Sequence, residues 1–196
     1  QSLAIKDKID AIIEKGSGKI CFGFGGNPKD SSAIRGGPAF ELFFNLHNLL
    51  KKKGIRNNYE MTFFAPMDQP GKRMGEKALA MMDKMFGMLD LKQHFGKKIK
   101  RFEEDGIVFE DDSKLDSDFT MFIPAGVGHE VIVNSDLPKN EAGFVKIDDH
   151  SNVRFSDIDN FCDGEDKDRP HNIYAIGDIA ALEGFDWRAK QGHIAE

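Results

Sequence analysis

An apolar run, Ile173–Ile176, ends at Gly177 and Asp178, and this pair is the first candidate for chemistry in the chain. In open α/β sheets, ligands bind beyond the carboxyl ends of the strands. An aspartate there can accept hydrogen bonds from ligand hydroxyl groups, and glycine lets a ligand approach the backbone closely. Gly-Asp pairs also occur in ordinary turns. The pair alone therefore leaves a ligand site and a simple turn as alternatives.

A glycine-rich stretch, GFGGNPKDSSAIRGGPAFE, starts at Gly23 and lies between a predicted strand and a predicted helix. In that context glycines let backbone amides approach a phosphate group. The G-x-G-x-x-G spacing is broken, because Pro28 stands where the third glycine is needed and nine residues separate Gly26 from Gly36. We expect a Rossmann-like layer with a remodelled phosphate loop, and an NAD(P) pyrophosphate site is the alternative.

The cysteines and histidines form no metal-binding or disulfide pattern. Cys21 lies in a predicted strand, where a small buried side chain is expected, whereas Cys162 lies in a polar loop without a basic neighbour. His47 falls among apolar helix residues and is expected in the core. The cluster Asp148–His150 is expected to be a solvated loop, so we predict no metal site.

Hydrophobic periodicity predicts helices that alternate with strands. Helices are expected over residues 3–15, 39–54, 72–91 and 185–196. Strands are expected over residues 19–24, 60–66, 98–104, 107–111, 119–124, 143–147 and 172–178, with a hairpin turn at Asp105-Gly106. This order predicts an α/β fold: a Rossmann-like three-layer domain with a mostly parallel sheet and an inserted β-hairpin.

Composition excludes several classes of protein. The chain has 196 residues, a net charge of −6 and no apolar stretch of the length that spans a bilayer, so neither nucleic-acid binding nor a transmembrane helix is expected. The first residues, QSLAIKDKID, lack the basic head and apolar region of a signal peptide. A cytoplasmic setting is the default expectation.

Four segments resemble a known family. NIYAIGDIA (172–180) is similar to the second flavin-contacting motif of flavoproteins with two dinucleotide-binding domains. GGPAFELFFNL (36–46), FTMFIPAGVG (119–128) and RAKQGHIAE (188–196) resemble corresponding segments of sulfide:quinone oxidoreductases. Together they span most of the chain from about residue 18 onward, and their combination is characteristic of the sulfide:quinone oxidoreductase family.

The resemblance implies functional positions in this chain. It places the cofactor FAD at Gly177, Asp178, Ile179, Lys190 and Gly192. His193 is a candidate for proton transfer, and Glu41 lies where related enzymes have a glutamate on the nicotinamide side, with a capping or solvated role as its alternative. Cys162 is a third catalytic candidate. One departure is Arg35, which stands where sulfide-oxidising members have a cysteine, so sulfide as the substrate is open.

The resemblance also implies a domain organisation. Residues 1–165 are expected to form the central NAD(P)-binding-like domain, and residues 166–196 to return into the FAD-binding domain. An N-terminal FAD segment and a C-terminal membrane-attaching tail would lie outside these 196 residues. The piece alone would then be inactive, and the longer protein would be cytoplasmic or peripheral to the bacterial inner membrane.

Three functions remain open from the sequence. The first is an FAD-dependent oxidoreductase that passes electrons from a small donor, sulfide or similar, to a quinone. The second is an NADH dehydrogenase-like flavoprotein that binds NAD(P)H, and the third is a non-enzymatic α/β binding module. The expected partners are a quinone and a small-molecule donor, not nucleic acid, and a homo-oligomer is a further option.

Overall fold

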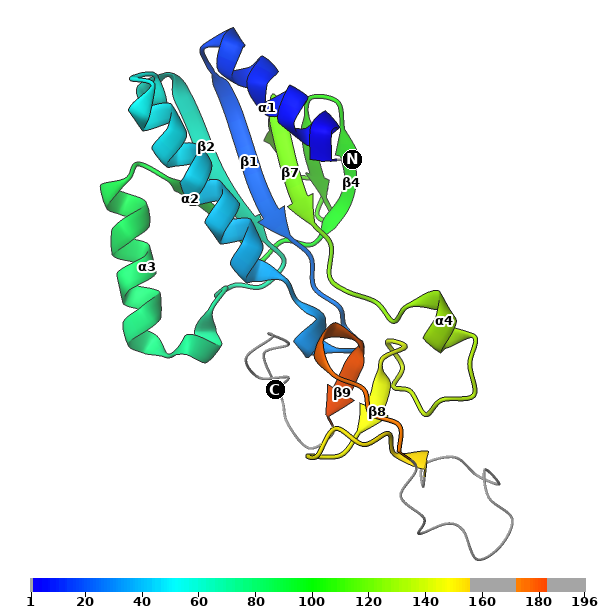
Figure 1. Ribbon diagram of the computed structural model, residues 1–196. Coiled ribbons are helices and arrows are strands. Elements are labelled where there is room, and N and C mark those ends of the chain that lie inside the picture. Colours follow the sequence, from blue (N-terminus) through cyan, green and yellow to red (C-terminus); the bar gives the residue numbers. More distant parts are fainter. Residues whose placement is uncertain (1, 156–171, 183–196) are drawn as a thin grey trace, which may run out of the picture. The chain divides into compact units, whose positions relative to one another are not determined.

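A computed structural model describes residues 2–155 and 172–182. The chain divides into two compact units (Figure 1). Unit 1 contains Gln1–Gly25 and Arg35–Pro124, and unit 2 contains Gly26–Ile34 and Ala125–Glu196. Unit 2 is therefore discontinuous, because its first segment interrupts unit 1.

Unit 1 is built on a four-stranded sheet in the order β3-β2-β1-β7, in which every neighbouring pair is parallel. The four strands are β1 (Gly18–Phe24), β2 (Tyr59–Ala65), β3 (Lys92–Phe95) and β7 (Phe119–Ile123). The helices of this unit are α1 (Ser2–Lys15), α2 (Gly36–Lys52) and α3 (Glu76–Met88). Short 3-10 turns cover Arg56–Asn58 and Lys72–Met74. The predicted helix over 72–91 is thus a turn followed by a shorter helix.

Phenylalanine rings fill the space between the sheet and the helices α2 and α3. Phe22 of β1 contacts Phe43 of α2 with ring centroids 5.5 Å apart, and Phe63 of β2 stacks on Phe40 at 4.0 Å. Phe86 of α3 packs against Phe43 at 6.1 Å. Alternate residues of a strand point to opposite faces, so this face of β1 carries large apolar side chains at every second position.

A second, antiparallel sheet covers the other face. Its strands are β4 (Ile99–Glu103), β5 (Gly106–Phe109) and β6 (Lys114–Asp116), in the order β4-β5-β6. Cys21 and Phe64 of the parallel sheet share a buried cluster with Ile107 and Phe109 of β5. The predicted hairpin at Asp105-Gly106 is confirmed and gains β6 as a third strand. The α/β, three-layer fold class with a mainly parallel sheet is confirmed.

Unit 2 contains α4 (Glu130–Val133) and two short parallel strands, β8 (Val145–Ile147) and β9 (Ala180–Leu182). Its 3-10 turns cover Ser31–Ala33 and Gly177–Ile179. The main core cluster of this unit contains Ile132, Val145, Ile147, Val153, Phe155, Ala175 and Ala180. Across the described parts of both units, no helix is long and apolar enough to cross a bilayer.

The predicted strand over residues 172–178 is wrong. Ile173, Tyr174 and Ile176 are 46%, 61% and 57% exposed, and this segment forms only an isolated bridge between Tyr174 and Asn152. The strand begins after the turn instead, because the small residues Ala180 and Ala181 fit the buried position beside β8. The predicted helix over 185–196 and the expected boundary between residues 165 and 166 lie outside the described residues.

Candidate functional site

The predicted cofactor residues Gly177, Asp178 and Ile179 form one 3-10 turn in unit 2. Gly177 has a φ of 70°, a left-handed conformation that favours glycine, and Asp178 is exposed. Ile179 packs against the core of unit 2, and Ala180, which follows it, is buried. Since both following residues are anchored, the backbone that carries the exposed Asp178 side chain is held on the surface of this unit.

This turn precedes β9, whereas the sequence placed Asp178 at the carboxyl end of a strand. A β-carbon at Gly177 would meet no atom within 4 Å, so the backbone there is open to a ligand. An exposed carboxylate beside open backbone suits the hydroxyl groups of a ribityl chain, and the residues present therefore fit a flavin. The side chain of Ile179 is partly buried against the core of unit 2.

The first glycine of the glycine-rich stretch has a packing role. Gly23 pairs with Phe64 on one side and Phe122 on the other, and these two rings stack with centroids 6.1 Å apart. A β-carbon at Gly23 would lie 2.4 Å from the Phe64 carbonyl oxygen. Glycine is required here because the neighbouring strand leaves no room for a side chain.

The loop after β1 is occupied by contacts within unit 2. The Asn27 side chain donates a hydrogen bond to the Gly126 carbonyl at 3.0 Å, and the Asp30 carboxylate accepts one from Asn140 Nδ2 at 3.0 Å. Asp30 also accepts from the Ser32 amide at 2.8 Å and caps the turn that follows. These contacts support the prediction of a remodelled phosphate loop, because the side chains of Asn27 and Asp30 form hydrogen bonds to other residues of unit 2.

Glu41 lies on the exposed side of α2. The buried side of that helix contains Ala39, Phe43, Leu46, His47 and Leu50. Its exposure agrees with a solvated glutamate, and the nicotinamide role stays a prediction. Glu41 lies in unit 1, whereas the turn Gly177–Ile179 lies in unit 2. The predicted site residues Cys162, Lys190, Gly192 and His193 lie outside the described residues.

Cys21 is a structural thiol, as expected. It is 1% exposed, and burial raises its pKa to about 11. At neutral pH the group is therefore a protonated thiol rather than the nucleophilic thiolate. Cys21 is unsuited to sulfur transfer.

Arg56, to which the sequence interpretation assigned no role, holds a buried network in unit 1. Its Nε donates to His47 Nδ1 at 2.9 Å, and its Nη1 donates to the Tyr59 carbonyl at 2.7 Å. Its Nη2 donates to the carbonyls of Leu89 and Asp90 at 3.1 and 2.6 Å, where α3 ends. Burial and the nearby Arg56 charge lower the pKa of His47, in agreement with its predicted core position.

The cluster Asp148, Asp149 and His150 brings possible ligand atoms together, but its hydrogen bonds are those of a turn. The Asp148 carboxylate accepts from the amides of His150 and Asn152 at 2.9 and 2.8 Å. Asp149 and His150 point to solvent, each with 83% of the side chain exposed. The arrangement agrees with the predicted solvated loop.

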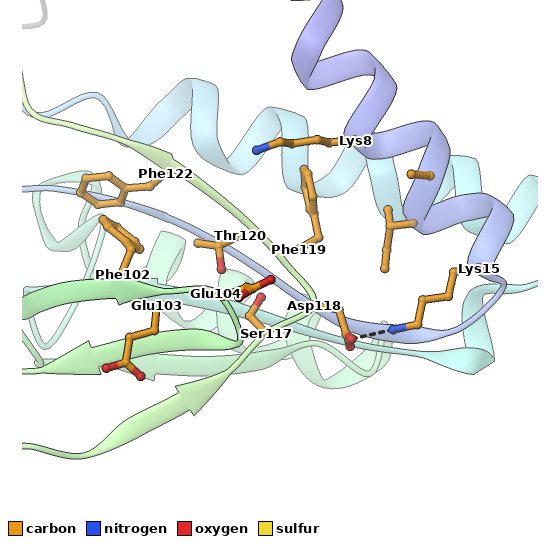
Figure 2. A pocket seen from close by; sticks show the side chains of 12 residues that line it. Lys8, Lys15, Phe102, Glu103, Glu104, Ser117, Asp118, Phe119, Thr120 and Phe122 are labelled. Carbon is orange, nitrogen blue, oxygen red and sulfur yellow. Dashed lines mark hydrogen bonds and ion pairs between the residues drawn. The ribbon is translucent and has the colours of Figure 1, made fainter.

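A surface pocket of about 740 Å³ lies in unit 1 between α1, β4 and β7 (Figure 2). Phe102, Phe119 and Phe122 give it apolar walls, and the Lys15 ammonium pairs with Asp118 at 2.6 Å at its edge. Of the predicted cofactor residues that the structure describes, Gly177, Asp178, Ile179 and Glu41, none lines it.

Comparison with known proteins gives relatives in sequence and in fold. No family model matches this sequence. The sulfide-quinone reductase of Aquifex aeolicus (strain VF5) is 29% identical over 107 residues, which cover 50% of this chain and 25% of that protein. The chain thus spans only a minor part of the length of this relative.

Solved structures share the fold. The sulfide:quinone oxidoreductase of Aquifex aeolicus superposes with a TM-score of 0.69 at 22% identity, covering 91% of this chain and 39% of that one. The ferredoxin reductase for the CYP199A2 system of Rhodopseudomonas palustris superposes with a TM-score of 0.57 at 14% identity, covering 93% and 37%. The resemblance to sulfide:quinone oxidoreductases that the sequence motifs indicated is therefore confirmed for the part of those proteins that this chain matches.

Proposed function

We propose that this chain is the central part of an FAD-dependent oxidoreductase resembling sulfide:quinone oxidoreductase. The full-length protein would take electrons from a small donor such as sulfide and deliver them to a quinone, at the periphery of a membrane. The observation that carries this proposal is the fixed, exposed Asp178 turn in a chain with sequence and fold similarity to a sulfide-quinone reductase.

The residues of unit 2 would hold the cofactor by ordinary hydrogen bonding. The Asp178 carboxylate would accept hydrogen bonds from ribityl hydroxyls, and Gly177 would leave the room that these hydroxyls need. We propose that Lys190 and Gly192 lie near the isoalloxazine ring and that His193 moves a proton there. When bound, the flavin would supply the two-electron redox chemistry.

Flavin retention by the full-length protein tests this role. Asp178→Ala removes hydrogen bonds to a charged group, which are typically worth about 1.5–3 kcal/mol, so flavin affinity should fall by about tenfold or more. The absorbance of bound flavin relative to protein measures the loss. Asp149→Ala is the matched control, because it removes another exposed carboxylate from a turn of unit 2. Unchanged retention in Asp178→Ala would refute the assignment.

An NADH-oxidising flavoprotein is the second candidate. Arg35, at the start of α2, replaces the cysteine of sulfide-oxidising relatives, and burial raises the pKa of Cys21 to about 11. Stopped-flow bleaching of the flavin separates the candidates. Reduction by sulfide supports the first, and reduction by NADH alone supports the second. A colourless full-length protein would contradict both and favour a binding module.

A further inference from the structure

The surface pocket of unit 1 is built from three elements and combines charged with aromatic walls (Figure 2). One side of α1 lines it through Lys8, Ala11, Ile12 and Lys15, and this spacing belongs to a single helix face. The facing walls come from the end of β4 and from β7. Its volume of about 740 Å³ lies within the range of about 300–1,000 Å³ that is typical of small-molecule sites. The pocket therefore has the size of a ligand site.

Three phenylalanines form the aromatic part of the pocket. Phe102 and Phe122 contact each other with ring centroids 5.2 Å apart, and Figure 2 shows Phe119 between this pair and Lys15. Phe102 is 47% exposed, although aromatic rings of its kind are usually buried. Aromatic rings pair favourably with one another, so a ligand with an aromatic body would cover the open surface of Phe102.

Three of the five charged side chains that line the pocket are already paired within the protein. The Lys15 ammonium pairs with the Asp118 carboxylate at 2.6 Å, and the Arg101 guanidinium pairs with the Glu103 carboxylate at 2.6 Å. Each of these carboxylates has its counterion in the protein. The charges that are available to a ligand are therefore those of the other two side chains.

These two side chains are Lys8 of α1 and Glu104, which directly follows β4. Neither has a hydrogen bond or ion pair to any residue in the described parts of the chain. Figure 2 shows the Lys8 ammonium extending over the pocket from α1, with the Glu104 carboxylate on the opposite wall near the Thr120 hydroxyl. A cation and an anion on opposite walls suit a ligand that carries both charges.

We propose that this pocket binds a zwitterionic α-amino acid with an aromatic side chain. The ligand carboxylate would lie at the Lys8 ammonium, and the ligand ammonium would lie at the Glu104 carboxylate. The ring would pack against Phe102 and Phe122. The proposal uses only residues of unit 1 and does not rest on the redox function, whose cofactor turn lies in unit 2.

An NMR titration of the isotope-labelled 196-residue chain with phenylalanine tests the proposal. We expect saturable shifts of backbone amides in α1, β4 and β7. Three analogues each remove one contact: phenylpropionate lacks the ammonium, phenylethylamine lacks the carboxylate and alanine lacks the ring. The first two should bind about two- to fivefold more weakly, as expected for the loss of an exposed ion pair. Alanine should bind about tenfold more weakly or less, because no ring is buried.

Variants then assign each charge to its partner. Lys8→Gln should weaken phenylalanine binding about two- to fivefold and leave phenylethylamine binding unchanged, because that analogue has no carboxylate to lose a contact. Glu104→Gln should weaken phenylalanine binding to a similar degree and leave phenylpropionate binding unchanged. Lys53→Gln and Glu110→Gln are the matched controls, since both positions are exposed and lie outside the pocket.

Circular dichroism verifies that each variant is folded, as expected for changes at exposed positions. Absence of saturable shifts would overturn the proposal, and so would equal affinity for phenylalanine and its two singly charged analogues. Equal losses in the pocket variants and their controls would also contradict it. Binding by the 196-residue chain but not by the full-length protein would overturn it too, because another segment would then occupy the pocket. The titration needs no flavin, so its failure is distinguishable from failure of the proposed redox function.

Discussion

At the scale of single residues, Gly177 and Gly37 differ in one property. A β-carbon would meet no atom within 4 Å at either position, but only Gly177 has a left-handed backbone, with a φ of 70°. Gly177→Ala should therefore lower the free energy of unfolding by about 1–2 kcal/mol. Gly37→Ala should be neutral or raise it by up to about 1 kcal/mol, because alanine restricts the unfolded chain.

Urea unfolding of the two variants beside the unchanged protein measures both effects. Similar losses in both would show that open space around the glycine, rather than its backbone angle, decides the result. A larger loss in Gly37→Ala would contradict the prediction outright.

The role of a residue could be predicted from the sequence where the residues next to it in the chain determine whether it is buried. Cys21 and His47 lie within apolar segments, and both are buried as expected. Arg56 could not be predicted in this way. Its partners include the carbonyls of Leu89 and Asp90, which are 33 and 34 residues away and have no sequence signature.

At the scale of elements, the long amphipathic helices and the apolar strands β1, β2 and β7 were predictable. Each of them packs against the same large core, so its apolar residues recur with the period of a helix or appear as an apolar run. The edge strand β3 was missed since its sequence, Lys-Gln-His-Phe, is mostly polar. The strand over 172–178 was predicted from its apolar residues, yet these residues are exposed. The strand that pairs with β8 is instead Ala180–Leu182, in which the small residues Ala180 and Ala181 are buried.

Two histidines should make stability depend on pH: His47, at the junction of α2 with the end of α3, and His94 of β3. Burial lowers the pKa of His47 and of His94 in the folded state, so folding favours their neutral forms. Below the unfolded histidine pKa of about 6.5 the unfolded chain binds more protons. The free energy of unfolding should therefore fall as the pH drops from about 6.5 towards 5, above the range in which the carboxylates titrate.

His47→Gln tests this junction, because glutamine keeps an acceptor for Arg56 and does not titrate. We expect the variant to lose less stability than the unchanged protein between about pH 7 and pH 5, with the remaining loss due to His94. Urea unfolding midpoints at the two pH values measure the difference. An unaltered pH dependence would show that His47 does not contribute.

At the scale of the whole molecule, each unit has its own core. Val145 is 1% exposed in the cluster of unit 2, and Met61 is fully buried in unit 1. Val145→Ala should cost about 2 kcal/mol and speed amide hydrogen exchange in unit 2 selectively. Met61→Ala should do the same in unit 1. Equal acceleration across both units after either change would show a single cooperative structure.

Residues 26–34 belong to unit 2 although they lie between two segments of unit 1. This arrangement also determines the order in which contacts can form during protein synthesis. Asp30 pairs with Asn140, which is added to the chain 110 residues later. At typical translation rates that interval is about 5–20 s. All four strands of the parallel sheet are synthesised before Asn140, so the sheet of unit 1 can close first. In the connection from β1 through α2 to β2, the loop between β1 and α2 is then the last part to form its contacts.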